Sequence, residues 1–569
     1  MVDLRADVNR NGKIDLDDPS EDVGEDTWDE KHGAIFLANI DDDQAACPKD
    51  ASDEDLAKCN DAADEVVNGP DDLLDLARIQ VRPWPEAPDD ASGTLTVGRL
   101  GAEHVRLFVK KEDQLIAFRP ESTSLSAADL RAGIELAIEG KDILRDRAIW
   151  DGFLDLTLRV TEGTKEVGTD TLRMRLAPII LANHLQPAEV VYFSDLGDPS
   201  QQEFRANLDV AVTEAKVPNR AHGLELESFD QWTQDFFETA YMSMPAPNGQ
   251  HAIRVAFRSA NIEGDDFGNA ALRTAGRIVF THLRGKDAAG VAEVDWNHDP
   301  EMDTLNSMGN TETIPPFSFG GQKFPLGRVL RGSTESYHPD KKFSALLEAQ
   351  GVQPAVLIDT SWLLVAHVDE TISFVKANTP RGWAMVVADP KLARDMLKTL
   401  ASQGQGGAVM FREKKWLDEE GQRERSAEVT VAQVLADEQI MASSARAAVG
   451  VSEQVDTIKQ ATGITESEIL RLPFLFMQTW EREVAYQVGT VNGVSLGDTD
   501  FGAPNPHGPV IDGKDIFKEQ MEKEFAKVGV RIHWIEDWDL YHRLDGEVHC
   551  ATNALRQVPQ NIKWWEGGR

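Results

Sequence analysis

The sequence predicts a multi-domain fold in which an N-terminal β-sandwich precedes an α/β domain. The chain has 569 residues, more than one hydrophobic core usually contains. Up to about Pro187 the texture is that of short alternating strands, and from there on buried strands alternate with helical patterns. We therefore expect a first domain over residues 1–187 and a second over residues 188–569.

The first region carries strand patterns separated by clusters of turn residues. Its strand candidates are short and rich in β-branched residues: AIFLANI, GTLTVGRL, HVRLFVK, FLDLTLRV and DTLRMRLAPII. Such segments, alternating between apolar and polar positions, are typical of strands with one buried face. A succession of them favours a β-sandwich.

The second region alternates two periodicities. The predicted buried strands are AVLIDT, WLLVAHV, ISFV, WAMVVAD and VRIHWIED. Apolar residues at helical spacing occur in DKKFSALLEAQ, PKLARDMLKTLA and KDIFKEQMEKEFAKV, and residues 429–462 are predicted to be largely helical with breaks around Gly450. No repeat of fixed period is visible in the sequence.

The charge balance limits the partners. The formal net charge is −39, from 97 acidic and 58 basic residues. Such a surface repels nucleic acid and anionic membranes and attracts cations, including Ca²⁺ and arginine-rich peptides, although solubility alone explains it equally well. No apolar run is long enough to span a membrane. The charged first residues lack the apolar stretch of a signal peptide, so we expect either a cytoplasmic protein or a secreted one whose signal has been removed.

The three cysteines divide into a pair and a single residue. Cys47 and Cys59 lie in a polar acidic stretch, and Cys550 stands alone near the C-terminus. A pair with one thiol left over is a pattern of secreted proteins. We predict a disulfide between Cys47 and Cys59.

Two short motifs could carry chemistry, and each has a plain structural alternative. GEVHC suggests a strand that ends at Cys550, but a lone cysteine is usually a small buried hydrophobic residue. VAHVDE places His367 and Asp369 at alternate positions at a strand end, so that both side chains would share one face. A histidine among apolar residues is equally often part of the core.

Two further patterns resemble known functional motifs. GVSLG, residues 493–497, fits the serine nucleophile pattern, but a loop follows where a helix is needed, so we do not predict a serine hydrolase. DVNRNGKIDLDD, residues 7–18, has oxygen-bearing residues at alternate positions around a glycine, as calcium loops do. Its flanks are not a clear helix pair, and an acidic turn is the alternative.

Together, several motifs resemble the protein-arginine deiminase family. They are LRADVNRNGKID, AIFLANIDDD, WTQDFFE, SMGNTETIPP, FPLGRVLRG, WLLVAHVDETISF, HGPVIDGKD and GEVHCATN followed by KWW. They occur in the family's order over nearly the whole chain. The chain resembles a secreted microbial member that begins at the second of the family's two immunoglobulin-like domains.

The resemblance implies an immunoglobulin-like sandwich followed by a five-bladed α/β propeller of the pentein type. It implies hydrolysis of peptidyl-arginine to peptidyl-citrulline and ammonia. The implied catalytic residues are Cys550 as nucleophile, His367 as general acid, and Asp235 and Asp369 as the guanidinium clamp. Trp232, Val365 and Arg543 are the implied substrate contacts.

This chemistry is also what a guanidinium needs. Two carboxylates can hold the planar cation and fix its orientation. A thiolate can then add to its central carbon, and an imidazolium can protonate the departing ammonia. Since a free thiol has a pKa of about 8.5, the thiolate needs a nearby positive charge, such as His367 or the substrate itself.

The resemblance further implies calcium, with fewer sites than in vertebrate relatives. Beside the active site the implied ligands are the side chains of Gln234, Glu238 and Glu312 and the main-chain oxygens of Met308 and Thr311. Two clusters are implied in the first domain: one of Asp7, Asn9, Asn11, Asp15 and Asn39, the other of Asp41, Asp43, Asp72 and Asp75. A second calcium near the active site is expected to be lost, because Phe236 and Arg258 stand where acidic ligands are expected.

Two alternatives remain open at this point. The family's arginines that hold the substrate main chain are not matched around Ala260 to Glu263 or at Leu544, and Arg543 is one position away. A related hydrolase of free arginine, agmatine or another small guanidine is therefore an alternative. A calcium-binding surface or adhesion protein is an alternative of another class. We expect arginine-containing proteins as partners, and neither nucleic acid nor a membrane.

Overall fold

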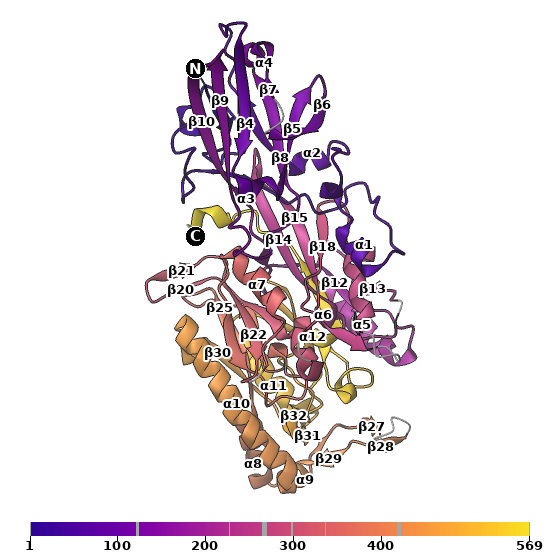
Figure 1. The fold of residues 1–569 in the computed structure, drawn as a ribbon. Helices are drawn as coiled ribbons and strands as arrows, with labels where there is room; N and C mark the ends of the chain where they lie inside the picture. Colours follow the sequence, from indigo (N-terminus) through magenta and orange to yellow (C-terminus); the bar gives the residue numbers. More distant parts are fainter. Residues whose placement is uncertain are drawn as a thin grey trace.

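Two five-stranded sheets form the first part of the chain (Figure 1). The computed structural model describes residues 2–120, 124–226, 228–264, 270–297, 300–335, 337–417 and 423–567. One sheet has the order β1 (Leu4–Ala6), β3 (Ala77–Val81), β8 (Ile134–Gly140), β5 (Val105–Lys111) and β6 (Gln114–Phe118). The other has the order β2 (Ala34–Phe36), β10 (Lys165–Leu176), β9 (Phe153–Glu162), β4 (Ala91–Val97) and β7 (Ser124–Leu125). The predicted sandwich is thus present, and each predicted strand pattern overlaps one of its strands.

Four short helices join these strands. They are α1 (Asp53–Lys58), α2 (Asp72–Asp75), α3 (Arg99–Ala102) and α4 (Ala127–Ala132). Ser52 caps the start of α1, and its side chain accepts a hydrogen bond from the main-chain N–H of Asp55. This contact satisfies one of the free N–H groups at the start of the helix. The disulfide between Cys47 and Cys59 closes the loop that contains α1, with Cα atoms 5.7 Å apart.

The second part of the chain contains five sheets of three or four strands. They are formed by β11 (Ile180–Leu181), β14 (Phe237–Ala246), β15 (Gly249–Arg258) and β18 (Ala288–Val291); by β13 (His222–Leu224), β12 (Ala188–Ser194) and β38 (Thr552–Arg556); by β19 (Thr311–Ile314), β22 (Arg328–Ser333) and β23 (Val356–Asp359); by β24 (Ile372–Lys376), β25 (Trp383–Asp389) and β30 (Ile469–Pro473); and by β33 (Val494–Gly497), β34 (Asp500–Pro504) and β37 (Arg531–Ile535). Each sheet combines at least one antiparallel pair with one parallel pair. A structural repeat is therefore present that no fixed sequence period revealed.

Helices and small hairpins connect these sheets. The helices are α5 (Gln202–Glu214), α6 (Thr233–Phe236), α7 (Lys341–Gln350), α8 (Pro390–Ser402), α9 (Val431–Ala436), α10 (Glu438–Thr462), α11 (Ile516–Ala526) and α12 (Val548–Ala551). The two-stranded pairs are β16 (Ile262–Gly264) with β17 (Ala270–Leu272), β20 (Phe317–Phe319) with β21 (Gln322–Phe324), β26 (Val409–Met410) with β29 (Val429–Thr430), β27 (Lys415–Leu417) with β28 (Glu424–Ser426), β31 (Phe476–Thr479) with β32 (Arg482–Ala485), and β35 (Val510–Ile511) with β36 (Lys514–Asp515).

The long helices begin where the sequence supplies caps. Asp389 caps α8, which has proline at its start, and Asp515 caps α11. Proline suits the first helical turn because N–H groups in that turn have no partner within the helix, so no hydrogen bond is lost. α10 begins at the cap Asp437 and ends at Gly463, which adopts the left-handed conformation. The three predicted helices DKKFSALLEAQ, PKLARDMLKTLA and KDIFKEQMEKEFAKV correspond to α7, α8 and α11.

Three local predictions were wrong. α10 runs through Gly450 without a break, and the glycine is there because Trp362 lies against it: a Cβ at this position would be 2.3 Å from the indole ring. The segment WLLVAHV is not a strand; His367 instead precedes a short 3₁₀ helix, Val368–Glu370. GEVHC is not a strand either, because residues 548–551 form the helix α12.

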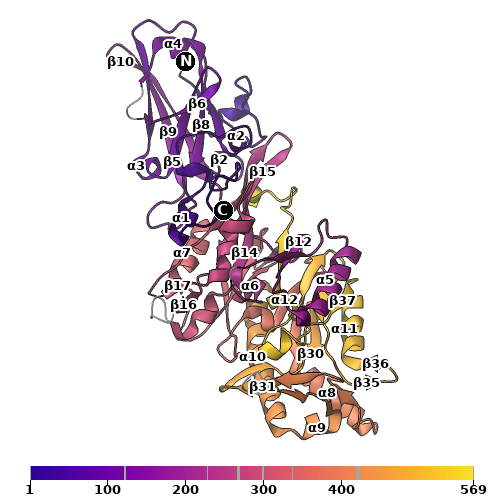
Figure 2. The same cartoon turned by 90° about the vertical axis from the view of Figure 1, so that its right-hand side faces the viewer.

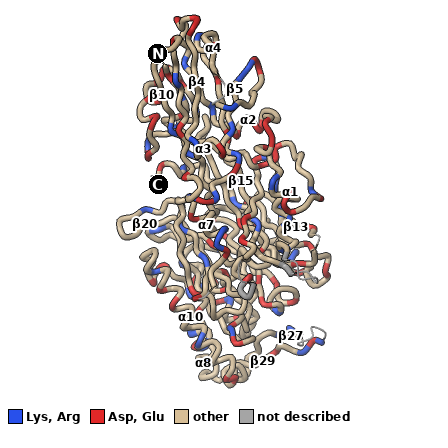
Figure 3. The backbone as a smooth tube through the Cα atoms, viewed as in Figure 1, with Lys and Arg blue, Asp and Glu red and all other residues tan. Residues whose placement is uncertain are grey.

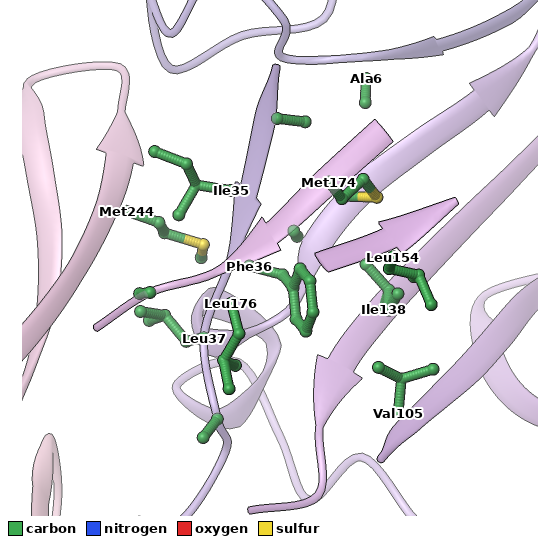
Figure 4. Packing of buried hydrophobic residues seen from close by; sticks show 14 of the residues in the cluster. Ala6, Ile35, Phe36, Leu37, Val105, Ile138, Leu154, Met174, Leu176 and Met244 are labelled. Carbon is green, nitrogen blue, oxygen red and sulfur yellow. The ribbon is translucent and has the colours of Figure 1, made fainter. Parts of the chain in front are cut away.

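The two parts of the chain share one hydrophobic core. It contains Ile35 and Met174 from the sandwich together with Met244 from β14 and Trp565 near the C-terminus. Figure 4 shows Met244 beside Ile35. The β14–β15 hairpin reaches up to the sandwich, as Figure 2 shows, and the C-terminus lies between the two parts (Figures 1 and 2). The sandwich is therefore packed against the α/β part rather than tethered to it.

The charged side chains are spread over the chain, with acidic positions gathered near α2 (Figure 3). Among the described residues, no helix is both long and apolar enough to cross a membrane.

Candidate active site

Cys550 lies on α12, which packs beside α6 in the middle of the α/β part (Figure 1). Its side chain is buried. Asn492 holds the thiol: its Nδ2 lies 3.3 Å from Sγ, while its Oδ1 accepts hydrogen bonds from the main-chain N–H groups of His549 and Cys550. Burial raises the pKa of the Cys550 thiol well above its usual value, and the nearby carboxylates of Asp369, Glu547 and Asp235 raise it further. The thiol is therefore protonated until a positive charge arrives.

Asp369 lies between the nucleophile and a histidine. Its Oδ2 is 2.8 Å from Nδ1 of His549 and 3.8 Å from Sγ of Cys550. A carboxylate accepts, so Nδ1 of His549 carries the proton and donates it. The Oδ2 atom of Asp369 is thereby held in place.

Asp235 is held in a similar way by an arginine. Nη1 of Arg273 donates to Oδ2 of Asp235 over 2.9 Å, and Nε and Nη2 of the same guanidinium bind both oxygens of Asp230 over 2.8 and 2.9 Å. The flanking Asp230 fixes the arginine, and the arginine fixes Asp235. Such bidentate contacts constrain orientation as well as position.

Each of the two carboxylates keeps its other oxygen free. Within the part of the chain that the structure describes, Oδ1 of Asp235 and Oδ1 of Asp369 are buried and have no hydrogen-bond partner. A buried carboxylate oxygen without a donor is costly. The pair therefore forms a receptor for a planar cation with several N–H groups.

Three of the predicted catalytic side chains converge at Gly309. A Cβ built on this glycine would be 2.8 Å from Nδ1 of His367, 3.1 Å from Oδ2 of Asp369 and 3.3 Å from Oδ1 of Asp235. Any side chain here would fill the point that the three groups face. The structure thus brings together His367, Asp369, Asp235 and Cys550, which the sequence places far apart.

His367 is oriented by its surroundings. Nε2 lies 2.9 Å from the carbonyl oxygen of Thr304, which can only accept, so Nε2 carries a proton and Nδ1 faces Asp235 at 3.8 Å. The main-chain N–H of His367 donates to Glu370, and the preceding Ala366 has a φ of 64°. A left-handed conformation at a non-glycine residue is strained and is frequent at functional sites.

The predicted substrate contacts lie at different distances from this centre. The ring of Trp232 covers Gly546, where a Cβ would be 2.3 Å from it, close in sequence to the nucleophile. The carbonyl of Val365 accepts from the Thr304 hydroxyl over 2.8 Å. Nε of Arg543 donates to the carbonyl oxygen of Asp539, and its Nη1 lies 3.5 Å from Oε1 of Glu424 in β28. Ala260 and Asn261 are buried and offer no guanidinium, and the side chain of Glu263 lies outside the described residues.

Sequence reasoning missed four residues of this centre. They are Asn492, His549, Arg273 and Gly309. Asn492 directly precedes GVSLG, a segment whose pattern suggests only a serine nucleophile. In the structure the Ser495 hydroxyl of that segment donates to the carbonyl of His184 and does not contact the thiol. A histidine directly before the nucleophile was the one available signal. Nothing in the local sequence pairs Arg273 with Asp235.

Comparison with known proteins agrees with this geometry. The family model described as "Protein-arginine deiminase (PAD)" matches residues 166–566. The chain belongs to the protein-arginine deiminase family.

Curated relatives cover nearly all of it. The chain is 28% identical to protein-arginine deiminase type-4 of Rattus norvegicus over 591 residues, which is 99% of this chain and 82% of the relative. It is 26% identical to the human type-1 enzyme over 590 residues, with the same coverage.

Solved structures that resemble it include a putative arginine deiminase from Porphyromonas gingivalis, with 12% identity over 67% of this chain and 98% of that one. Another is an agmatine deiminase of Enterococcus faecalis, with 10% identity over 67% and 96% of the two chains. Both TM-scores are 0.36.

Three of the five ligands that the family resemblance implies for calcium beside the active site line one cavity. The cavity, of about 20 Å³, is lined by Gln234, Glu238 and Glu312, and also by His184 and His549. Thr311 starts β19, and Met308 lies in the 3₁₀ helix Met308–Asn310 just before it. The three oxygen-bearing side chains fit a cation, and the same lining also carries the guanidinium of Arg556.

Arg258 and Phe236, which stand where the family resemblance expects ligands of a second calcium, are both buried in contacts with protein. Arg258 is 1% exposed, and its Nη1 is 2.8 Å from Oδ2 of Asp53 in α1. Its Nη2 donates to the carbonyl of Arg273 over 3.1 Å. Phe236 is buried in an apolar cluster with Leu56 of α1. The guanidinium of Arg258 therefore supplies positive charge at the place where the sequence predicts that a calcium ion is missing.

Acidic residues of the sandwich form a second candidate calcium centre. Asp41, Asp43 and Asp61 bring oxygens within 4.8 Å of one another, and so do Asp75, His251 and Asp287 with their ligand atoms. Both oxygens of Asp41 and one each of Asp43 and Asp75 are buried without a hydrogen-bond partner among the described residues. Carboxylates left in this state fit a hard cation such as Ca²⁺. Asp61, His251 and Asp287 were not predicted.

The other residues predicted to bind calcium in the first domain do not group as the sequence predicts. In the loop after β1, Asp7, Asn9 and Asn11 accept hydrogen bonds from main-chain N–H groups of residues 11–13, and Asp15 accepts one from Asp17. Asn39 instead donates to Asp72 over 2.7 Å and to Glu139 over 2.8 Å. The structure thus places Asn39 with the second predicted cluster.

Proposed function

We propose that this enzyme, a hydrolase of the protein-arginine deiminase family, converts peptidyl-arginine to peptidyl-citrulline at Cys550. The observation that carries the residue assignment is the convergence of Oδ1 of Asp235, Oδ2 of Asp369 and Nδ1 of His367 at Gly309, beside the thiol. A substrate guanidinium there would give a partner to Oδ1 of Asp235, which is buried without one among the described residues. Family membership supports the reaction, and the geometry supports these residues.

The chain's own groups account for each step. The bound guanidinium provides the positive charge that the buried thiol needs for ionisation, and Nδ1 of His367 accepts the Sγ proton. Sγ of Cys550 adds to the guanidinium carbon, and Nδ1 of His367 passes that proton to the nitrogen that leaves as ammonia. The remaining thiouronium carbon is then attacked by water, one of whose protons His367 accepts. The C–S bond breaks, His367 returns this proton to the thiolate, and citrulline is released as the hydroxyl proton passes to solvent.

Calcium in the sandwich centre would offset the buried charge of Asp41, Asp43 and Asp75 and so fix the loops that carry them.

We infer that the chain divides into two domains at residue 187. Strand β11 precedes this boundary and pairs with β14, which follows it. The five similar sheets support a five-bladed pentein propeller, and the two facing sheets support an immunoglobulin-like sandwich. The Cys47–Cys59 disulfide supports secretion, since such bonds persist in oxidising compartments.

The test measures ammonia and citrulline released from a blocked arginine amide and from an arginine-containing protein. We expect turnover of both, and its loss in Cys550→Ser with an unchanged melting temperature. Absence of turnover at every Ca²⁺ concentration would overturn the proposal.

A comparison of free with peptide-bound arginine addresses the substrate. Arg543 is engaged by Glu424, and Ala260 and Asn261 cannot replace the arginines that hold the peptide main chain in the family. We therefore expect peptide arginine to be preferred through Trp232 and the guanidinium clamp, with weak dependence on neighbouring residues. Faster turnover of free arginine would favour the alternative hydrolase of small guanidines.

A further inference from the structure

A cavity lies between the sandwich and the tip of the β14–β15 hairpin. Its volume is about 460 Å³, which is within the usual range of small-molecule sites. One wall comes from the loop after β1, from strands β2, β3 and β10 and from α2, and the other from the hairpin between residues 244 and 251. Ligand sites often lie where two packed units meet. We call this space the hairpin cavity.

The inner wall of the hairpin cavity is apolar. Ile35, Met174 and Met244 line it and belong to the hydrophobic core that the two parts of the chain share (Figure 4). Leu73 and Leu74 of α2 extend this apolar surface outward, and Leu74 is 56% exposed. Methionine side chains are flexible and adapt to apolar groups of different shapes. The inner wall therefore suits an alkyl chain or a ring.

Two cations stand at the rim of the cavity. Lys13 and Arg78 are exposed, and neither forms an ion pair within the part of the chain that the structure describes. The other ionisable groups of the lining are already engaged. Asp7 accepts two main-chain N–H groups of its own loop over 2.9 Å, and Nε2 of His251 lies 2.6 Å from Asp75. The rim thus offers two unpaired positive charges on a protein whose net charge is −39.

We propose that the hairpin cavity binds a small amphiphilic anion, namely a carboxylate with an alkyl or aromatic body. The body would lie against Ile35, Met174 and Met244, and the carboxylate would bind Lys13 and Arg78. A guanidinium can hold a carboxylate through two hydrogen bonds, and an ammonium adds a point charge. A cationic ligand would be repelled at the same rim.

Such a ligand would hold the two walls of the cavity together. Gly12 already touches the hairpin, since a Cβ on it would overlap the carbonyl group of Ala246. β14 and β15 pair in unbroken register from Phe237 and Arg258 to this tip. A ligand that contacts the loop after β1 and the hairpin at once therefore stabilises the packing of the sandwich on the α/β part.

The experiment titrates the full chain with octanoate at one fixed Ca²⁺ concentration, and isothermal titration calorimetry measures binding. Octanol and octylammonium, which have the same chain length, are the matched probes. We expect one octanoate per chain, octanol to bind at least about tenfold more weakly, and octylammonium not to bind. Octanoate should also raise the melting temperature, because it binds the folded state.

Methionine methyl groups report where the octanoate binds. The chain has 12 methionines, and among them Met174 and Met244 line the hairpin cavity. In the protein labelled with ¹³C at these methyl groups, octanoate should shift the resonances of Met174 and Met244 and leave those of distant methionines unchanged. Met174→Leu and Met244→Leu assign the two signals.

Variants at exposed positions separate the charge from the apolar wall. Arg78→Gln and Lys13→Gln should each weaken octanoate binding by about tenfold and leave octanol binding unchanged. Leu74→Ser should weaken the binding of both probes. Arg159→Gln, which removes an exposed cation of β9, and Leu100→Ser, which removes an exposed leucine of α3, are the controls and should have no effect.

Four results would overturn the proposal. They are absence of octanoate binding, equal affinity for octanol or octylammonium, methyl shifts confined to methionines outside the cavity, and octanoate affinity that neither Arg78→Gln nor Lys13→Gln reduces. The methyl shifts of the unaltered chain decide the question even if a variant fails to fold. No step requires turnover, so the result is independent of the proposed reaction at Cys550.

Discussion

At the scale of single residues, the site depends on how two carboxylates are held. Asp235 is bound through Oδ2 by Arg273 and Asp369 through Oδ2 by His549, and the Oδ1 atom of each is buried without a hydrogen-bond partner among the described residues. The two anchors are cations, so they also offset the charge of the clamp. Without them, two buried carboxylates would repel each other.

We expect Arg273→Met to raise KM more than it lowers kcat. Asp235 would lose its orientation, and Asp230 would lose the partner that neutralises it. A tenfold fall in kcat/KM corresponds to about 1.4 kcal/mol of lost transition-state binding, and we expect at least this much. Steady-state kinetics with a blocked arginine amide would measure it.

Two variants accompany this measurement. Arg273→Lys retains the charge and should recover part of the loss. Arg381→Met removes a remote arginine paired with Glu468 and should leave KM unchanged. Unaltered kinetics in Arg273→Met would mean that Asp235 needs no anchor.

The pH dependence of Cys550 follows from its burial. Because burial and the neighbouring carboxylates raise its pKa, the reactive thiolate is scarce at neutral pH and increases as pH rises. Alkylation of the free enzyme by iodoacetamide should therefore be slow at pH 7 and should still be increasing at pH 9. Cys550 is the only thiol outside the disulfide, so mass spectrometry can follow it directly. A rate that levels off near pH 7 would contradict this account.

At the scale of elements, turns rather than strands position the chemistry. His367 and Asp369 lie at a 3₁₀ helix, Cys550 lies on a helix of one turn, and Asp235 lies on another. The sequence predicted strands at the first two because apolar residues surround them. Buried short helices have the same composition as buried strands, so periodicity over five residues cannot separate them.

The longer elements were predictable for the opposite reason. α7, α8 and α11 show more than two turns of helical spacing, with caps at their starts, and the sandwich strands alternate clearly. The proposed catalytic set Cys550, His367, Asp235 and Asp369 could be predicted from the sequence because it lies in recognisable motifs, and the structure places these residues near one another. Arg273, Asn492 and Gly309 could not, since their roles exist only through contacts made by folding.

Gly450 gives a test at this scale. Glycine in a helix interior usually costs about 1 kcal/mol relative to alanine. Here a Cβ would be 2.3 Å from the ring of Trp362, which begins the segment leading to His367. We therefore expect Gly450→Ala to lower the melting temperature and reduce kcat/KM. Val449→Ala, at an exposed position of the same helix, should do neither. Stabilisation by Gly450→Ala would show that the indole ring moves freely.

At the scale of the whole molecule, the sandwich is expected to need its cations. Asp41, Asp43 and Asp75 bury oxygens that have no hydrogen-bond partner in the described chain. An ion that binds only the folded state stabilises it by mass action. Removal of Ca²⁺ with EGTA should lower the melting temperature, and added Ca²⁺ should restore it. Asp41→Asn should reduce the difference between the two conditions. An unchanged melting temperature would argue against calcium in the sandwich.

The disulfide loop links the sandwich to the active site. Leu56 of α1 packs against Phe236 and Phe237, next to Asp235. Asp53 pairs with Arg258 and Arg277 of the α/β part over 2.8 and 2.5 Å. The same guanidinium of Arg258 holds the carbonyl of Arg273, whose side chain holds Asp235. Contacts therefore run without a gap from the loop to the clamp.

We expect Cys47→Ser with Cys59→Ser to lower both stability and substrate affinity. A cross-link over a loop of this length is worth about 3 kcal/mol or less in the chain-entropy model. Thermal melting gives the loss of stability, and KM for a blocked arginine amide gives the effect on the clamp. A reductant should reproduce both changes in the unaltered enzyme and add nothing in the double variant. If melting falls while KM stays constant, the loop stabilises the fold without acting on Asp235, because the contacts through Arg258 then survive the loss of the cross-link.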